Sequence, residues 1–371
     1  MKRTIIPVYI LCIALFAIRE FKHQEYNWDT LPYMAVILSY DNADINSVHN
    51  EVYNTIKEQA PANDYQLLAD GGIEMRKHSA ENASYFKEQL PFYTVKPFYT
   101  KFAYCFYKAG APLTKATLLP SVISYFFIGL LIFFWLKKYL HPFLLFPVCL
   151  LIMLCRPVLS AASISTPDCL SALILLSAFY FLIEKKSFAG VCIFLILSIF
   201  TRLDNIIPAL FIITLLTFTD KWKEKISFKT FSVLGIIMYG SYFFISHNVQ
   251  KYGWSIFYYP SFISHLNPDY DSHSAFSFSN YFSVVHSQIM SGLFFSDLIL
   301  FLLLGSLLFI DKDLSKTLSF DQILFIVIVL IIFLRFILQP VIADRLYISY
   351  YISIVVLLIK KIGLKFERDI V

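Results

Sequence analysis

Residues 199–210 read IFTRLDNIIPAL and place Arg202 and Asp204 between two apolar runs, 187–201 and 204–219. Both runs are slightly shorter than the roughly 17–25 apolar residues that a helix needs to cross a bilayer. A charged side chain near the bilayer centre costs about 2.5–3.5 kcal/mol on insertion scales. What these two charges do therefore depends on the side of the membrane that they face.

The whole chain has the composition of an integral membrane protein. Of its 371 residues, 58% are hydrophobic and 15% are charged, and the mean hydropathy is +0.64. A soluble domain of this length would be more polar. The six cysteines form no CxxC pair, so neither a disulfide framework nor a zinc site is expected. The apolar start of the chain lacks a small-x-small cleavage site, which favours a retained first transmembrane helix.

Hydropathy predicts an all-α, polytopic membrane protein with about ten transmembrane helices. The expected spans are 4–19, 117–136, 140–156, 168–184, 187–201, 204–219, 229–246, 291–310, 321–338 and 345–360. The chain is divided into a first transmembrane helix (1–19), a large extracytoplasmic outer segment (20–116) and a multi-span domain (117–371) with an outer loop at 247–290.

Lysine and arginine are distributed unevenly between the alternating loops. With the amino terminus inside, the inner segments carry 16 Lys and Arg residues, and the outer loops beyond the outer segment carry only Arg156, Arg202, Lys251, Arg335 and Arg345. The positive-inside rule then places these loops and the outer segment on the extracytoplasmic side. Within the outer segment we expect an amphipathic helix over 44–60 and an aromatic, basic interfacial stretch over 89–110, broken by prolines.

Three charged residues before or near predicted helices have both a structural and a functional interpretation. Asp29 in YNWDTLPY suits a turn or helix cap, or a general base at the membrane surface. Lys96 in VKPFY suits a lysine that reaches the lipid headgroups, or a ligand of phosphate. Asp168 follows proline before an apolar run, as an N-cap does.

The remaining outward charges also have two interpretations. Asp204 suits an N-cap, and on a helix Arg202 would point to a different face, so the two need not pair. Arg335 and Arg345 flank the outer turn between the last two spans and suit contacts with headgroups. Arginine also binds pairs of phosphate oxygens, which makes both residues candidates for a phosphate site.

Together these elements resemble the polytopic GT-C glycosyltransferases, a fold class that includes dolichyl- and undecaprenyl-phosphate-sugar-dependent mannosyl- and aminoarabinose transferases. The motifs are, in chain order, WD at Asp29, KPFY at 96–99, TPD at 166–168, TRLD at 201–204 and RFILQP…DRLY at 335–347. The resemblance implies an enzyme that moves a sugar from a polyprenyl-phosphate-linked donor to a hydroxyl acceptor on the extracytoplasmic face.

The resemblance also implies roles for individual residues. Asp29 would be the catalytic acidic residue, and Lys96, Arg202 and Arg345 would bind the donor phosphate. Supporting residues would be Asp41, Asp44, Tyr99, Asp168, Asp204 and Arg335. The family often has paired acids after the first helix, whereas WDT offers one, so Asp41 and Asp44 are candidates for the second. No cofactor is expected: acids could hold Mg²⁺ or Mn²⁺ through waters, but a monophosphate donor does not require a metal.

The implied partners are a polyprenyl-phosphate sugar donor, a glycan, lipid or protein acceptor and membrane lipids, with no nucleic acid. The Phe-, Ile- and Lys-rich composition fits an AT-rich bacterial genome. Together with the resemblance, this implies a bacterial inner or plasma membrane, with the site facing the periplasm or exterior and serving cell-envelope glycan or glycolipid synthesis. Alternatives are an O-antigen-polymerase-like or ligase-like envelope enzyme, a lipid or solute transporter, and an inactive scaffold. A transporter would carry charges within its spans, whereas these spans are almost free of charge.

Overall fold

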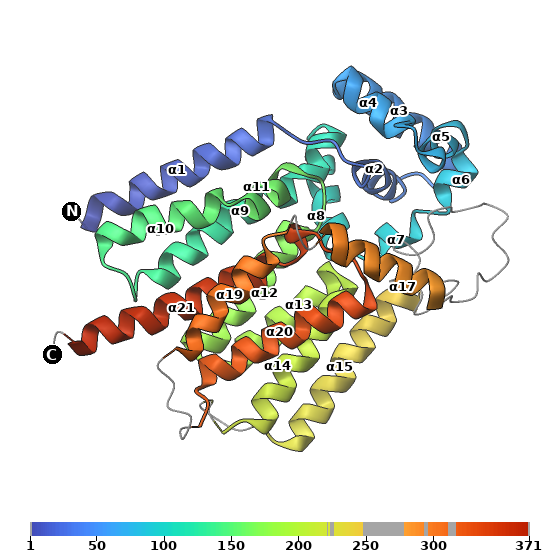
Figure 1. Ribbon diagram of the computed structural model, residues 1–371. Helices are drawn as coiled ribbons and strands as arrows, with labels where there is room; N and C mark the ends of the chain where they lie inside the picture. Colours follow the sequence, from blue (N-terminus) through green and yellow to red (C-terminus); the bar gives the residue numbers. More distant parts are fainter. Residues whose placement is uncertain are drawn as a thin grey trace.

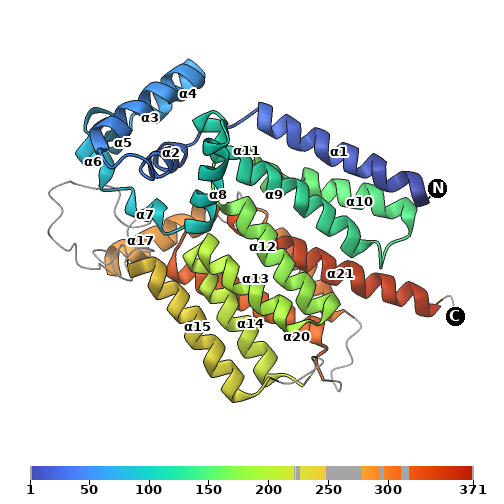
Figure 2. The same ribbon diagram turned by 180° about the vertical axis from the view of Figure 1, so that it is seen from behind.

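The computed structural model describes residues 2–220, 222, 226–247, 278–292, 296–310 and 317–369. Apart from one isolated bridge, the regular secondary structure of these residues is helical, which confirms the all-α prediction. Long helices form a bundle, and a group of short helices lies at one end of it (Figures 1 and 2).

A helix lies in each of the ten apolar segments predicted from the sequence. The bundle helices are α1 (Lys2–Lys22), α9 (Leu113–Leu136), α10 (Pro142–Leu154), α12 (Asp168–Tyr180), α13 (Phe188–Thr201), α14 (Ile206–Phe218), α15 (Phe228–His247), α19 (Leu298–Ser306), α20 (Phe320–Leu338) and α21 (Ile348–Asp369). Short helices adjoin five of them: α11 (Arg156–Ser163), η1 (Phe181–Lys185), η2 (Leu203–Asn205), η5 (Leu307–Phe309) and η6 (Asp344–Leu346).

Three helices, α9, α15 and α20, are each long and apolar enough to cross a membrane. The pair α10 and α11 meets the same criterion together but is bent by 57°, so the described residues hold up to four such spans. These helices support an integral membrane protein. The other predicted spans are helical too, and a total of ten crossings stays a prediction.

The outer segment folds into a series of short helices. They are α2 (Thr30–Leu38), α3 (Ile45–Gln59), α4 (Ala62–Ala69), α5 (Glu74–Glu81), α6 (Ala83–Lys87), α7 (Pro91–Thr94) and α8 (Pro97–Lys108). The predicted amphipathic helix is α3, which buries Val48, Val52 and Ile56 in the outer segment's own hydrophobic core. Both α7 and α8 begin at a proline, because proline suits the first turn of a helix.

The outer segment lies at the end of the bundle opposite the two chain termini (Figure 1). Helix α17 (Phe278–Ser287), continued by η4 (Gln288–Gly292), lies at the same end. Most of the predicted outer loop 247–290 falls outside the described residues. The turns that hold Asp29, Asp168, Arg202 and Arg345 lie together at the end that carries the outer segment.

Two contacts position the turns that carry the acidic residues. Helix α12 packs against α9, α13 and α21, so its first residue, Asp168, lies among several helix ends. The isolated bridge pairs Glu25, after α1, with Ile164, before α12, in parallel, and the Glu25 amide donates to the carbonyl of Ser163 at 2.9 Å. The bridge holds the chain that leads to Asp29 beside the chain that leads to Asp168.

The orientation of the outer segment can be tested with a native cysteine. Cys105 on α8 is exposed, whereas Cys149, Cys169 and Cys192 are buried in the bundle. We expect a membrane-impermeant maleimide, added outside intact cells that express the protein, to label it, and Cys105→Ser to abolish the labelling. Labelling that appears only after the cells are permeabilised would place the outer segment on the cytoplasmic side.

Candidate functional site

Charged side chains that the sequence nominated for a site come from distant parts of the chain and meet at the end of the bundle that carries the outer segment. They are Asp29, Lys96, Asp168, Arg202, Asp204, Arg335 and Arg345, hereafter the charge network. Asp29 and Arg345 are in contact although 316 positions separate them. The structure thus brings together most of the residues that the motifs nominated.

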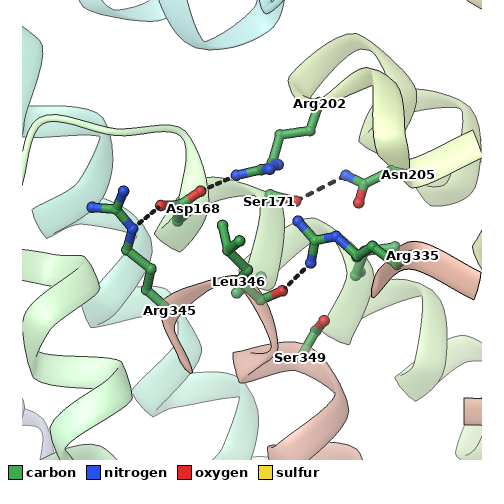
Figure 3. Close-up of a pocket in the computed structure, with 10 residues that line it drawn as sticks. Asp168, Ser171, Arg202, Asn205, Arg335, Arg345, Leu346 and Ser349 are labelled. Carbon is green, nitrogen blue, oxygen red and sulfur yellow. Dashed lines mark hydrogen bonds and ion pairs between the residues drawn. The ribbon is translucent and has the colours of Figure 1, made fainter. Parts of the chain in front are cut away.

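Arg202 joins two aspartates and lies at the centre of the network. Its Nη1 contacts Asp168 (Figure 3), while Nε and Nη2 donate to the two carboxylate oxygens of Asp204 at 3.0 and 3.2 Å. The expectation that Arg202 and Asp204 point to different faces is wrong. Helix α13 ends at Thr201, and Arg202 is extended (φ −152°, ψ 127°). Because α13 stops at Thr201 and the separate turn η2 begins at Leu203, the spacing rule for one continuous helix does not apply, and the two side chains meet.

Arg335, from the last turn of α20, contacts Asp204 as well. Its Nη2 lies 2.5 Å from Asp204 Oδ2, and its Nη1 donates to the carbonyl of Leu346 at 2.5 Å. The Arg335 side chain is only 6% exposed. Its interpretation as a headgroup contact is therefore wrong, since the guanidinium is buried between α20 and η6.

Arg345, in η6, connects the bundle to the outer segment. Its Nε lies 3.2 Å from Asp168 Oδ2 (Figure 3), and its Nη2 donates to Asp29 Oδ2 at 3.4 Å. The side chains of Arg345 and Asp29 are 32% and 29% exposed, whereas those of Asp168, Arg202 and Asp204 are 12% exposed or less. The Arg345–Asp29 pair is therefore the accessible edge of the charge network.

The three aspartates of the network do not act as helix caps. Asp29 precedes α2 and Asp204 lies in η2, but neither side chain accepts a capping hydrogen bond from the backbone. Asp168 is the first residue of α12, and its Oδ2 accepts from Thr166 Oγ1 at 3.0 Å. The N-cap interpretation is wrong for Asp168 and Asp204, whereas Asp29 lies in a turn at the N-cap position of α2, as expected, with its oxygens engaged by Tyr93 and Arg345.

Lys96 lies just before α8, over two tyrosine rings. Its Nζ donates to the carbonyl of Phe92 at 3.0 Å and lies 5.4 and 4.9 Å from the ring centroids of Tyr33 and Tyr93. Burial, and then the nearby positive charge of Arg202, lower the pKa of Lys96 to about 8, against the opposing effect of the aspartates. The ammonium group is thus held near the charge network, whereas a lysine among headgroups would keep a pKa near about 10.4.

Tyr99 packs against Tyr33, one of the two rings that Lys96 contacts. Its hydroxyl donates to the carbonyl of Thr117 in α9 at 2.6 Å, and its ring packs edge-on against Tyr33 at 4.7 Å. The side chain is fully buried. It reaches Asp29 only through other tyrosines, and the supporting role that the resemblance implied stays a prediction.

The two acids proposed as a second catalytic carboxylate have other partners. Asp41 accepts from the hydroxyl of Tyr104 at 2.7 Å and from Lys108 Nζ at 3.3 Å on the exposed side of α8. Asp44 caps α3 by accepting from the backbone amides of two residues in its first turn. The carboxylate that Arg345 links to Asp29 is instead Asp168.

A small cavity lies among the arginines (Figure 3). It is lined by Asp168, Ser171, Ala172, Leu175, Arg202, Asn205, Arg335, Arg345, Leu346 and Ser349. Its volume of about 10 Å³ is that of about one water molecule. Three of these residues, Ser171, Asn205 and Ser349, belong to none of the sequence motifs. Asn205 directly follows the TRLD motif, but serines in apolar helices carry no distinguishing signal.

The network has more cations than anions. Three aspartates face three arginines and Lys96, so one positive charge is in excess when Lys96 is protonated. This excess favours a singly charged anion, and the accessible edge at Arg345 is where such an anion can enter. Within the described residues, no group of three or more His, Cys, Asp or Glu side chains is placed to hold a metal ion. The expectation that no metal is needed stays a prediction.

Comparison of the chain with protein-family models, with curated proteins and with solved structures gives no match.

The contribution of the buried charges to stability can be measured. We expect Arg335→Leu to lower the free energy of unfolding by about 3 kcal/mol, because it leaves Asp204 with one fewer partner in an apolar environment. Adding Asp204→Asn should recover at least half of this loss, since Arg202 then keeps Asp168 as its counter-ion. Thermal unfolding in detergent measures both changes. Equal stability of the Arg335→Leu variant and the unchanged protein would contradict the prediction.

Proposed function

We propose that this protein is a membrane glycosyltransferase of the GT-C type. It transfers a sugar from a polyprenyl-phosphate-linked donor to a hydroxyl acceptor at the extracytoplasmic face of a bacterial inner or plasma membrane. The observation that carries the proposal is the accessible edge of the charge network, where the Asp29 carboxylate meets the Arg345 guanidinium, with Lys96 nearby. A base beside unneutralised positive charge is what this reaction needs.

The positive charge suits the donor's phosphate. A phosphodiester between a sugar and a polyprenyl chain carries one negative charge, which equals the excess positive charge of the network. Arg345 is the most exposed of the three arginines, so it is the group that contacts the phosphate directly. Arg202 is paired with two aspartates, and Arg335 is paired with Asp204 and the carbonyl of Leu346, so both act through their charge. The lipid chain would lie along the apolar helices.

The reaction then proceeds by a single displacement. Asp29 takes the proton of the acceptor hydroxyl while the acceptor oxygen attacks the anomeric carbon. The bond between that carbon and the phosphate oxygen breaks, polyprenyl phosphate leaves, and the anomeric configuration inverts. Lys96, Arg202 and Arg345 stabilise the negative charge that develops on the phosphate, an effect of about 3–4 kcal/mol for a well-placed group.

Binding of the donor's lipid phosphate is the first test. We expect native mass spectrometry to show saturable one-to-one binding of polyprenyl phosphate, weakened about 10-fold or more by Lys96→Ala and by Arg345→Ala, because each variant loses a charged contact. Lys108→Ala is the matched control, since Lys108 pairs with Asp41 outside the network. Absent binding, or equal binding by all variants, would remove these cations from the site and favour a transporter or a scaffold.

The same preparation tests transfer with a panel of polyprenyl-phosphate sugars. Asp29→Asn should retain lipid binding but lose at least about 100-fold in turnover, because the base is gone. Asp41→Asn should behave like the unchanged protein. Turnover that survives Asp29→Asn would rule out Asp29 as the base.

Lipid binding should also depend on pH through Lys96. With a pKa of about 8, Lys96 is protonated at pH 7 and neutral above pH 9, so the affinity for polyprenyl phosphate should fall across this interval. The second pKa of a lipid phosphate is near about 6, so its own charge changes little above pH 7. Lys96→Arg, which stays charged, should abolish the fall. An identical pH dependence in both proteins would contradict the role of Lys96.

A further inference from the structure

We infer that Tyr93 is a positioning residue that fixes the carboxylate of Asp29 through its hydroxyl, so that Oδ2 of Asp29 takes the acceptor's proton. The inference rests on the proposed function. It deepens that function by naming a residue that the motifs do not include and the oxygen atom that acts as the base.

The two oxygens of Asp29 have different partners. Oδ1 accepts from the hydroxyl of Tyr93 at 3.0 Å. Oδ2 faces Nη2 of Arg345 and Nδ2 of Asn27, each at a longer distance of 3.4 Å. The short, directed hydrogen bond is therefore on Oδ1, and Oδ2 has the weaker and more replaceable contacts.

Tyr93 is held firmly by its surroundings. It packs against all three hydrophobic clusters of the described structure, that of the bundle, that of the outer segment and the small cluster around Tyr33 and Tyr99. Its ring meets Tyr33 edge-on at 4.9 Å with an interplanar angle of 86°. Lys96 lies over its ring. Packing on several sides leaves the hydroxyl one position, which is toward Asp29.

The Tyr93 hydroxyl serves as a donor and not as a base. Burial, and then the negative charge of Asp29, raise the pKa of Tyr93 well above its usual value. The phenol therefore stays protonated across the pH range in which the protein works, and its proton stays directed at Oδ1.

Arg345 is the partner that changes. Its side chain is long and partly exposed, and the proposed reaction directs it to the donor phosphate. When Nη2 turns to the phosphate, Oδ2 loses this counter-ion, keeps only the 3.4 Å contact with Asn27 and becomes the oxygen that accepts the proton. Without the Tyr93 hydroxyl, the carboxylate could rotate about its Cβ–Cγ bond and lose this alignment. A misplacement of about 1 Å in a reacting group can cost about 100-fold in rate.

The test compares two conservative variants. Tyr93→Phe removes only the hydroxyl, and Tyr104→Phe is a matched control that breaks the same kind of tyrosine–aspartate hydrogen bond, with Asp41, away from the network. For each variant the kcat, the KM for the donor, polyprenyl phosphate binding and the unfolding temperature are measured. We expect the kcat of Tyr93→Phe to fall about 10- to 100-fold with donor KM and binding unchanged, and Tyr104→Phe to match the unchanged protein.

The alternative results separate the inference from the proposed function. An unchanged kcat in Tyr93→Phe, beside an active unchanged protein, would overturn the positioning role alone. A Tyr93→Phe protein that unfolds early and no longer binds the lipid would show that the hydroxyl serves the fold, which also overturns the role. An unchanged protein that is inactive with every polyprenyl-phosphate sugar would overturn the proposed function and this inference with it.

Discussion

The structure depends on the pairing of charges that are buried in an apolar bundle. Arg202 is held between Asp168 and Asp204, and Arg335 supplies a second cation to Asp204. Leaving one member of such a group without a partner is costly, because an isolated charge in a low-dielectric environment has no water to solvate it. The start of α12, the turn between α13 and α14 and the end of α20 are therefore constrained to one arrangement. Helix packing alone, which is largely non-directional, would allow several.

The charge network divides its three arginines by exposure. Arg202 and Arg335 are buried and saturated with partners, and they maintain the arrangement of the helices. Arg345 shares Asp168 with Arg202 and also pairs with Asp29, but it remains partly open, so it is the member that can exchange a protein partner for an incoming anion. Stability and recognition thus use the same type of side chain, and local burial separates the two tasks. This division explains how a densely paired cluster can still present a usable positive charge.

Much of this arrangement could be predicted from the sequence. The apolar segments, the amphipathic α3 and the charged turns follow from periodicity and from the uneven distribution of Lys and Arg. The Arg202–Asp204 pair could not be predicted, because it depends on where α13 ends. The part played by Asp41 could not be predicted either, since its partners lie on α8, which is distant in the chain. Tyr93 gave no signal in a sequence that contains 24 tyrosines.

The parallel bridge between Glu25 and Ile164 has a consequence for how this chain can change over time. Each bridged residue lies four positions before an aspartate of the network: Glu25 before Asp29, and Ile164 before Asp168. One added residue lengthens an extended chain by up to about 3.5 Å, which is as long as an ion-pair contact. An insertion or deletion within either interval would therefore break the alignment of the two carboxylates across Arg345. These two spacings are expected to resist length variation even where the side chains between them drift.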